Sequence, residues 1–303
     1  MSYPAGTMVL TPDGWKTIEQ VKHTDKVAEC HDGELVFSNP VDTSSRIYTG
    51  NLVNVDARNY GFITTPDHVH TLAENRYDRS RKATSAELHT LRHHYVRVAA
   101  PLARRDREVH DPDFARMVGM MRSNMLLFLR THILVRVQLS TIRPYMIALM
   151  DKIGISYTQK DARFEVARHP RLMAYFNENG FLRRSTLLQL DQESLKLFIQ
   201  GTINWRGRTR PPSFSTEVTR LPRKETALML ELCARAGMSA CERVVDDRWL
   251  HVKVRPEREN LLPLKTGVID YSGRVYDLAT PTGTLFTRTA HKQALTTDGT
   301  LTL

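Results

Sequence analysis

The chain has 303 residues, of which 41% are hydrophobic and 25% charged, so it can bury one large core or two moderate ones. Its 43 Lys and Arg against 33 Asp and Glu give a formal net charge of +10, which attracts polyanions such as nucleic acid, although charge also serves solubility alone. Cys30, Cys233 and Cys241 are too widely spaced for a Cys-x-x-Cys site, and their odd number argues against a disulfide framework.

The sequence contains neither an apolar run long enough to span a membrane nor the charged and apolar blocks of a secretion signal. These features predict a soluble, cytoplasmic monomer in a reducing compartment, with no membrane partner.

Residues 7–71 have the pattern of short strands separated by turns, which predicts an all-β segment. Ala83 to Leu88 is expected to form a short helix before a strand at Tyr95–Val98. Turns are predicted at Pro12–Gly14, His31–Gly33 and Tyr48–Gly50.

From Asp113 the apolar spacing becomes helical. Helices are predicted around Phe114–Met121 and Ile142–Ile153, and again around Leu195–Ile203 and Lys224–Ala236. The second pair follows the first by roughly 80 residues, which indicates an internal duplication of a helix, two strands and a helix. From Leu262 strands return, with turns expected at Tyr271–Gly273 and Thr282–Thr284 and a strand at Val275–Leu278. The changes of period divide the chain into residues 1–105, 106–262 and 263–303, with the first and last segments forming one domain.

The two end segments carry an ordered set of motifs. Ser2 opens the sequence Ser-Tyr-Pro-Ala-Gly-Thr, Thr65-Pro-Asp-His68 follows some sixty residues later, and Asp277 lies in a predicted strand near the end. An isolated Thr-x-x-His is more often a surface histidine, but the ordered combination is specific. Together the ends resemble the Hint splicing domain of an intein, a protein that excises itself from a host polypeptide.

The resemblance implies an all-β, horseshoe-shaped splicing fold and a role for each residue. Ser2 would attack the preceding carbonyl in an N–O (in cysteine relatives N–S) acyl shift, His68 would protonate the amide nitrogen, Thr65 would hold the strained peptide, and Asp277 would assist the nucleophile and later cleavage. Most members carry cysteine at the first position, and the sequence leaves open whether Ser2 is native or a replacement. Splicing needs no cofactor, and its partners are the flanking host segments in cis.

Two departures from the family appear. Thr284 stands where members often have histidine, two positions before Phe286. Members also end in His-Asn, whose asparagine cyclises, whereas this sequence stops at Leu303. We expect a chain trimmed to block the final step, with Met1 as an added start residue.

The duplicated middle resembles a double-motif LAGLIDADG homing endonuclease, a mixed α/β domain with a repeated αββαββα order. Its two central helices would pack closely at Gly119 and Gly201, and each would deliver a catalytic aspartate to divalent metal. Asn124 and Arg206 stand at those positions, and a register shifted by two offers only Asn204. An amide is a poor Mg²⁺ ligand and a guanidinium repels the ion, so cleavage is expected to be lost and no metal bound.

Binding to double-stranded DNA is expected to survive through arginines on the strands and loops. The candidates are Arg163, Arg168, Arg171, Arg183, Arg184, Arg208 and Arg210. Two alternatives remain open. An active site-specific endonuclease would recruit Asp111, Asp113 or Asp191 to bind Mg²⁺, and a non-catalytic DNA-binding protein would use the β domain only as support.

Overall fold

The computed structural model divides the chain into two compact units. The first unit comprises Met1–Ala103, Gly237–Glu242 and Pro256–Leu303, and the second Arg104–Ala236 and Arg243–Arg255. The structure describes residues 2–57, 60–74, 79–91, 94–97, 99–103, 109–137, 140, 142–203, 217–244, 249–255, 259–261, 266–289 and 292–297. No helix in these ranges is long and apolar enough to cross a membrane.

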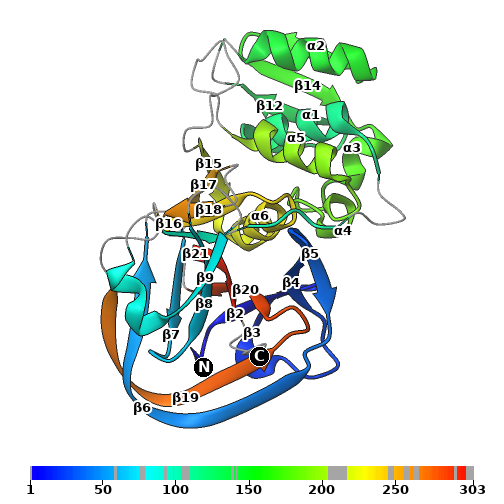
Figure 1. The fold of residues 1–303 in the computed structure, drawn as a ribbon. Helices are drawn as coiled ribbons and strands as arrows, with labels where there is room; N and C mark the ends of the chain where they lie inside the picture. The colour runs from blue at the N-terminus through cyan, green and yellow to red at the C-terminus, as the bar shows by residue number, and fades with distance from the viewer. Residues whose placement is uncertain are drawn as a thin grey trace. The chain divides into compact units, whose positions relative to one another are not determined.

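Two long curved strands frame the first unit and join its two ends (Figure 1). Strand β6 (Asp42–Asp56) pairs antiparallel with β19 (Gly267–Ala279) along the whole length of β19. The short strand β1 (Tyr3–Pro4) lies on the other side of β19, and β7 (Gly61–Thr64) lies beside β6. The resulting order β1-β19-β6-β7 brings the N-terminal residues against the C-terminal segment.

The turns expected at Tyr48–Gly50 and Tyr271–Gly273 are wrong, because β6 and β19 run straight through them. Tyr48 lies opposite Gly273, and Gly50 opposite Tyr271. Each tyrosine covers the glycine two residues further along its own strand: a Cβ on Gly50 would lie 3.0 Å from the Tyr48 hydroxyl, and one on Gly273 2.9 Å from that of Tyr271. The glycines therefore make room for aromatic rings in a curved ladder, and they do not mark turns.

The remaining strands of the first unit form further antiparallel layers. Strands β3 (Gly14–Thr17), β2 (Met8–Thr11), β20 (Thr284–Thr289), β21 (Lys292–Thr297) and β16 (Ser239–Val244) are neighbours in that order. A second sheet has the order β18 (Glu259–Leu261), β10 (His94–Arg97), β8 (Val69–Glu74) and β9 (Arg79–Thr84), and β4 (Val27–His31) forms a hairpin with β5 (Glu34–Ser38).

Two 3₁₀ helices, η1 (Ile18–Gln20) and η2 (Ser85–Thr90), complete the first unit. The helix expected from Ala83 begins only at Ser85, because Ala83 pairs with His70 in the β8–β9 ladder. Thr84 and Glu87 form a capping box that fixes this start.

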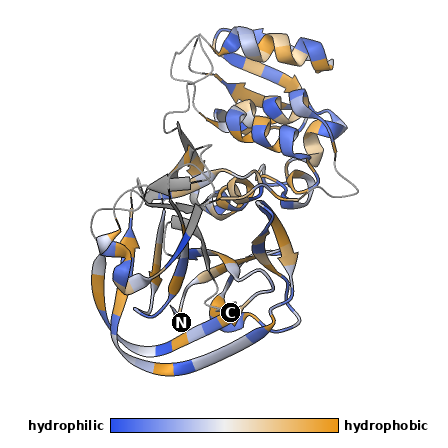
Figure 2. Cartoon of the chain, in the orientation of Figure 1, coloured by the Kyte–Doolittle hydropathy of each residue, from blue (hydrophilic) through white to orange (hydrophobic). Residues whose placement is uncertain are grey.

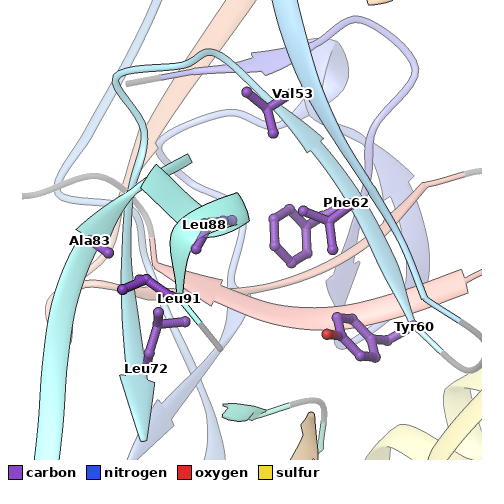
Figure 3. Packing of buried hydrophobic residues seen from close by; sticks show 8 residues of the cluster. Val53, Tyr60, Phe62, Leu72, Ala83, Leu88 and Leu91 are labelled. Atoms are coloured by element: carbon purple, nitrogen blue, oxygen red, sulfur yellow. The ribbon is translucent and has the colours of Figure 1, made fainter. Parts of the chain in front are cut away.

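One core of the first unit gathers residues from β6, β7, β8, β9 and η2 (Figure 3). Its buried members are Val53, Val55, Tyr60, Phe62, Leu72, Ala83, Leu88 and Leu91. A second cluster joins Tyr3, Val9 and Val27 to Leu278 and Leu285 from near the other end of the chain. Burial of this apolar surface holds the two terminal segments together.

The second unit is mixed α/β. Its order in the described residues is α1 (Pro112–Arg122), β11 (Met125–Phe128), β12 (His132–Arg136), α2 (Arg143–Ile153), β13 (Tyr157–Lys160), β14 (Arg163–Ala167), α3 (Pro170–Ala174), α4 (Arg184–Leu187), α5 (Gln192–Thr202), β15 (Glu217–Pro222), α6 (Arg223–Arg235) and β17 (Trp249–Arg255). Helices α1, α2 and α5 carry both hydrophobic and hydrophilic segments (Figure 2), as amphipathic helices do.

Helices α1 and α5 pack directly on each other at two glycines. A Cβ on Gly119 would lie 2.2 Å from the Phe198 carbonyl oxygen, and one on Gly201 2.3 Å from that of Arg116. No side chain fits there, so both positions require glycine for the helices to approach this closely. The helix pair α1 and α2 recurs as α5 and α6 about 80 residues later.

The unit borders differ in detail from those drawn on the sequence. The first falls between Ala103 and Arg104, close to residue 105. The second border, expected near residue 262, is not at one position in the chain. Gly237–Glu242 already belongs to the first unit, and Arg243–Arg255 belongs to the second unit again. Cys241 of β16 pairs with Lys292 of β21, and this strand pairing accounts for the early return.

Candidate functional site

Ser2 and Thr65 are joined by two hydrogen bonds although 63 residues separate them. The Ser2 amide nitrogen donates to Thr65 Oγ1 at 2.9 Å, and the Thr65 amide nitrogen donates to the Ser2 carbonyl oxygen at 2.9 Å. Both residues are fully buried. The nitrogen of the peptide bond preceding Ser2 therefore lies in a fixed, dry environment, where hydrogen bonds are stronger than in water.

Asp67 orients the Thr65 hydroxyl. Its carboxylate accepts a hydrogen bond from that hydroxyl, which leaves the Thr65 oxygen lone pairs to accept the Ser2 N–H. Burial acts to raise the pKa of Asp67, but the hydrogen bond from Thr65 and further stabilising interactions of the carboxylate outweigh it, and the net shift is downward. Asp67 is not among the site residues predicted from the sequence, although it lies inside the Thr-x-x-His motif.

The His68 imidazole lies between two aromatic neighbours and is fully buried. The Tyr3 ring meets it edge-on with centroids 4.8 Å apart, and the His70 ring is also 4.8 Å away. The His68 amide nitrogen donates to the Thr65 carbonyl oxygen at 3.1 Å, which closes the turn of the motif. The imidazole thus packs on the residue that follows Ser2.

His70 is a buried partner of His68 that the sequence analysis did not select. Its Nε2 lies 2.7 Å from Ser85 Oγ, which in turn lies 2.7 Å from Thr64 Oγ1 and donates to the His68 carbonyl oxygen at 3.2 Å. Burial, and then repulsion from a charged His68, hold the pKa of His70 well below its usual value of 6.5. His70 is therefore an uncharged side chain that packs against the His68 ring.

This shift predicts a pH dependence of stability. Above about pH 6.5 His70 is neutral in both the folded and the unfolded chain. Below that pH the unfolded chain takes up a proton that the folded chain excludes, so the free energy of unfolding decreases as the pH is lowered. We expect the thermal midpoint of His70→Gln, which can keep the bond to Ser85, to decrease less than that of the parent when the pH is lowered from about 7.5 to 5.5. His89→Gln, at an exposed histidine, should match the parent; equal losses in all three chains would contradict the prediction.

Asp277 is placed by the β1–β19 ladder. Tyr3 pairs with Tyr276, and the same antiparallel register extended by one residue puts Asp277 opposite Ser2. Residues opposite each other in such a ladder have Cα atoms about 4.5–5.5 Å apart. On its other side Asp277 pairs with Ser44 of β6. Ser2, Thr65, His68 and Asp277 therefore meet in one region of the first unit.

Thr284, the position of the first departure, lies at the start of β20 and joins it to β4. Its Oγ1 accepts a hydrogen bond from the Cys30 amide nitrogen at 2.8 Å, and its amide nitrogen donates to Thr280 Oγ1 at 3.2 Å. Beside it the buried Glu29 carboxylate accepts from the Thr282 amide and hydroxyl at 2.9 and 2.7 Å. In this chain the position thus serves the turn between β19 and β20.

Asn124 follows the C-cap of α1, and its side chain turns back onto the helix. Its Nδ2 donates to the Met120 carbonyl oxygen at 2.7 Å. A carboxylate could not make this bond, because it has no proton to donate. Within the described ranges no group of three or more His, Cys, Asp or Glu could hold a metal ion. Arg206 and Asn204 lie outside the described residues.

The alternative carboxylates lie at the other end of the central helices. Asp111 and Asp191 are the N-terminal caps of α1 and α5, whereas Asn124 lies beyond the C-terminus of α1, about 20 Å from Asp111 at a rise of 1.5 Å per residue. Asp111 pairs with Arg171 at 2.5 Å, Asp191 lies 2.5 Å from His110, and Asp113 pairs with Lys152 at 2.6 Å. The bond to Asp191 raises the pKa of His110. All three carboxylates are engaged in helix caps or ion pairs.

The candidate arginines have different surroundings. Arg163 is exposed on β14, and Arg168 and Arg183 are exposed and donate to carbonyl oxygens. Arg171 lies over the Phe114 ring at 4.4 Å, and Arg184 binds Glu231 with two nitrogens at 2.9 and 2.6 Å. Arg171 and Arg184 are therefore held by structural contacts, while Arg208 and Arg210 lie outside the described residues.

The sheet of the second unit exposes a row of cations that the sequence analysis missed in part. Arg136 of β12 pairs with Arg163 of β14, which pairs with Lys160 of β13. All three side chains are exposed, whereas Val135 and Phe164 beside them point to the buried face. Like charges directly opposite each other destabilise a sheet, and of these three cations Lys160 also pairs with Glu165 at 3.4 Å. The three residues lie next to each other only because of the strand register, which the linear sequence does not show.

The comparisons with known proteins give structural matches only. No family model matches the chain, and a search of curated proteins finds no match either. The structure is similar to a splice-inactive variant of the AceL NrdHF class 3 split intein, with a TM-score of 0.40, 7% identity and 99% of each chain covered. It is also similar to I-DmoI in complex with DNA and Mn, with a TM-score of 0.33, 13% identity, and 47% of this chain and 89% of that chain covered. Mesophilic variants of the homing endonuclease I-DmoI match with a TM-score of 0.30, 13% identity, and coverages of 47% and 83%.

Proposed function

We propose that the first unit is a protein-splicing domain that performs an acyl shift at the peptide bond between residue 1 and Ser2. The observation that carries the proposal is the buried pair of hydrogen bonds between Ser2 and Thr65, which seats the nitrogen of that bond beside the motif that holds His68.

The chemistry follows from the positions of these groups. Ser2 Oγ forms an ester bond to the carbonyl carbon of residue 1 while the carbon–nitrogen bond breaks. The hydroxyl loses one proton and the Ser2 nitrogen gains one, so the step is a net proton transfer from oxygen to nitrogen. His68 delivers the proton to the nitrogen, since imidazole titrates near neutrality. Asp277, opposite Ser2, assists removal of the hydroxyl proton.

The test is a reporter protein fused directly before Ser2. Hydroxylamine cleaves an ester but not an amide, so it should release the reporter from the parent and not from Ser2→Ala. Ser272→Ala removes an exposed hydroxyl from β19 and is the matched control. With His-Asn and a following Cys, Ser or Thr added between two reporters, ligated reporters should appear. A parent that resists hydroxylamine while folded would refute the proposal.

For the second unit we propose binding to double-stranded DNA without cleavage. The cation row of Arg136, Arg163 and Lys160 supports binding, and the amide of Asn124, bonded to its own helix, supports the loss of cleavage. We expect plasmid that contains the uninterrupted host gene to remain uncut with Mg²⁺ or Mn²⁺. Linear product would favour the active endonuclease instead.

The cation row predicts the salt dependence of DNA binding. Changing Arg136, Lys160 and Arg163 to Gln should make the plot of log K against log salt shallower by about 2–3, since each lost phosphate contact removes roughly 0.9. The control changes Lys22, Lys26 and Arg274 to Gln, which alters net charge equally on the first unit. Gel shifts at several salt concentrations measure both slopes. If the two triple variants gave the same slope of log K against log salt concentration, DNA binding would depend on net charge and not on the cation row.

A further inference from the structure

Arg46 of β6 contacts the nucleophile of the proposed acyl shift. Its Nη2 lies 3.5 Å from Ser2 Oγ, in a direction that lets the guanidinium donate to the hydroxyl oxygen. Its Cζ lies 5.3 Å from the centre of the Tyr48 ring, two residues along the same strand. The ring supports the guanidinium from behind, because aromatic faces attract cations.

The strand register explains why this cation reaches Ser2. Arg46 pairs with Val275, and Val275 pairs with Pro4. The neighbouring row, two residues away on the same sheet face, contains Ser44, Asp277 and, by the same register, Ser2. By this register the Arg46 and Asp277 side chains lie on the same face of the β6-β19-β1 sheet as Ser2, so a cation and a carboxylate are both placed near its hydroxyl.

A cation beside the Ser2 hydroxyl can assist its attack on the preceding carbonyl. A hydroxyl is a weak nucleophile, and negative charge on its oxygen must be stabilised as it attacks. Arginine is permanently protonated and has no acceptor, so it cannot serve as the base that takes the hydroxyl proton. It can only donate to the oxygen lone pair, which leaves the proton for another group and favours the charged form of the nucleophile.

We propose that Arg46 is a catalytic residue of the acyl shift, which stabilises the negative charge that develops at Ser2 Oγ as the new carbon–oxygen bond forms. This inference rests on the function proposed for the first unit. It adds a residue outside the motifs, supplied by the frame strand β6.

The test measures hydroxylamine-dependent release of the reporter in matched variants. Arg46→Met should slow release about 10-fold or more, and Arg46→Lys should recover part of the rate because it restores a cation. Arg274→Met is the control: Arg274 is also exposed, lies on the partner strand opposite Ile47, and bonds Ser45 Oγ at 3.0 Å, away from Ser2. Its rate should stay within about two-fold of the parent.

A second readout separates charge stabilisation from a structural effect. In a Ser2→Cys background the thiolate is the nucleophile, so the rate of thiol-dependent release rises with pH around the thiol pKa. Arg46→Met should move that rise to higher pH, while Arg274→Met should not. An unchanged midpoint, or an unchanged rate in the serine background, would overturn the role of Arg46. A folded parent that releases no reporter would instead refute the splicing function, and the role of Arg46 with it.

Discussion

Replacement of His68 by alanine is expected to lower release of the reporter by about 10²–10⁴-fold, the usual worth of a positioned general acid. The departing amine nitrogen must gain a proton, and His68 is the titratable side chain that packs against Tyr3, next to that nitrogen. Its burial excludes the water that could otherwise supply the proton. The measurement is the rate of hydroxylamine-dependent release at constant pH.

Two comparisons distinguish chemistry from folding in this experiment. His68→Gln retains much of the side-chain volume but cannot shuttle a proton, so it should be nearly as slow as His68→Ala while unfolding at a temperature closer to that of the parent. His89→Ala alters an exposed histidine that bonds the Ala86 carbonyl oxygen, and it should leave the rate unchanged. A rate for His68→Gln within about three-fold of the parent would assign the proton to another donor.

The sequence was most informative where a local pattern determined the structure. Apolar spacing located α1, α2, α5 and α6 to within about three residues, and α2 ends at Gly154, whose φ of +72° is typical of a glycine that follows a helix. The order of the end motifs led us to expect Ser2 and Thr65 close together, and the structure joins them by two hydrogen bonds. The helices follow from the period of the apolar residues, whereas the approach of Ser2 to Thr65 was expected from the resemblance that the ordered motifs carry.

What the sequence could not show depends on register and on distant partners. Gly50 and Gly273 suggested turns, because the tyrosines that cover them are recognisable only once β6 and β19 are paired. The approach of Arg46 to Ser2 requires three strands in the correct alignment. Arg184 looked like a ligand for phosphate, yet Glu231, 47 residues away, holds it. Charge composition alone does not separate a paired arginine from one that is available to bind.

The buried ion pair between Arg122 and Glu225 gives the largest predicted effect on stability in the second unit. Arg122 Nε lies 2.6 Å from Glu225 Oε2, the side chains are only 9% and 3% exposed, and Glu225 Oε1 also accepts the Leu182 amide at 2.9 Å. Glu225→Gln keeps an acceptor for Leu182 but leaves Arg122 buried without its counter-charge. We expect a loss of about 3–5 kcal/mol in unfolding free energy, measured by urea denaturation. Helical circular dichroism reports this unit, because the described α-helices all lie in it.

A double substitution tests whether the lost charge balance is the cause. Arg122→Met alone should also be costly, because it leaves the Glu225 carboxylate buried, whereas Arg122→Met with Glu225→Gln removes both charges and should recover most of the loss. Glu165→Gln, which breaks the exposed pair with Lys160, should cost less than about 1 kcal/mol. Additive losses in the double variant would contradict the argument. Arg122 lies in the last turn of α1 and Glu225 in the first turn of α6, where each charge also suits its helix dipole, so the pair fixes the end of α1 that carries Asn124.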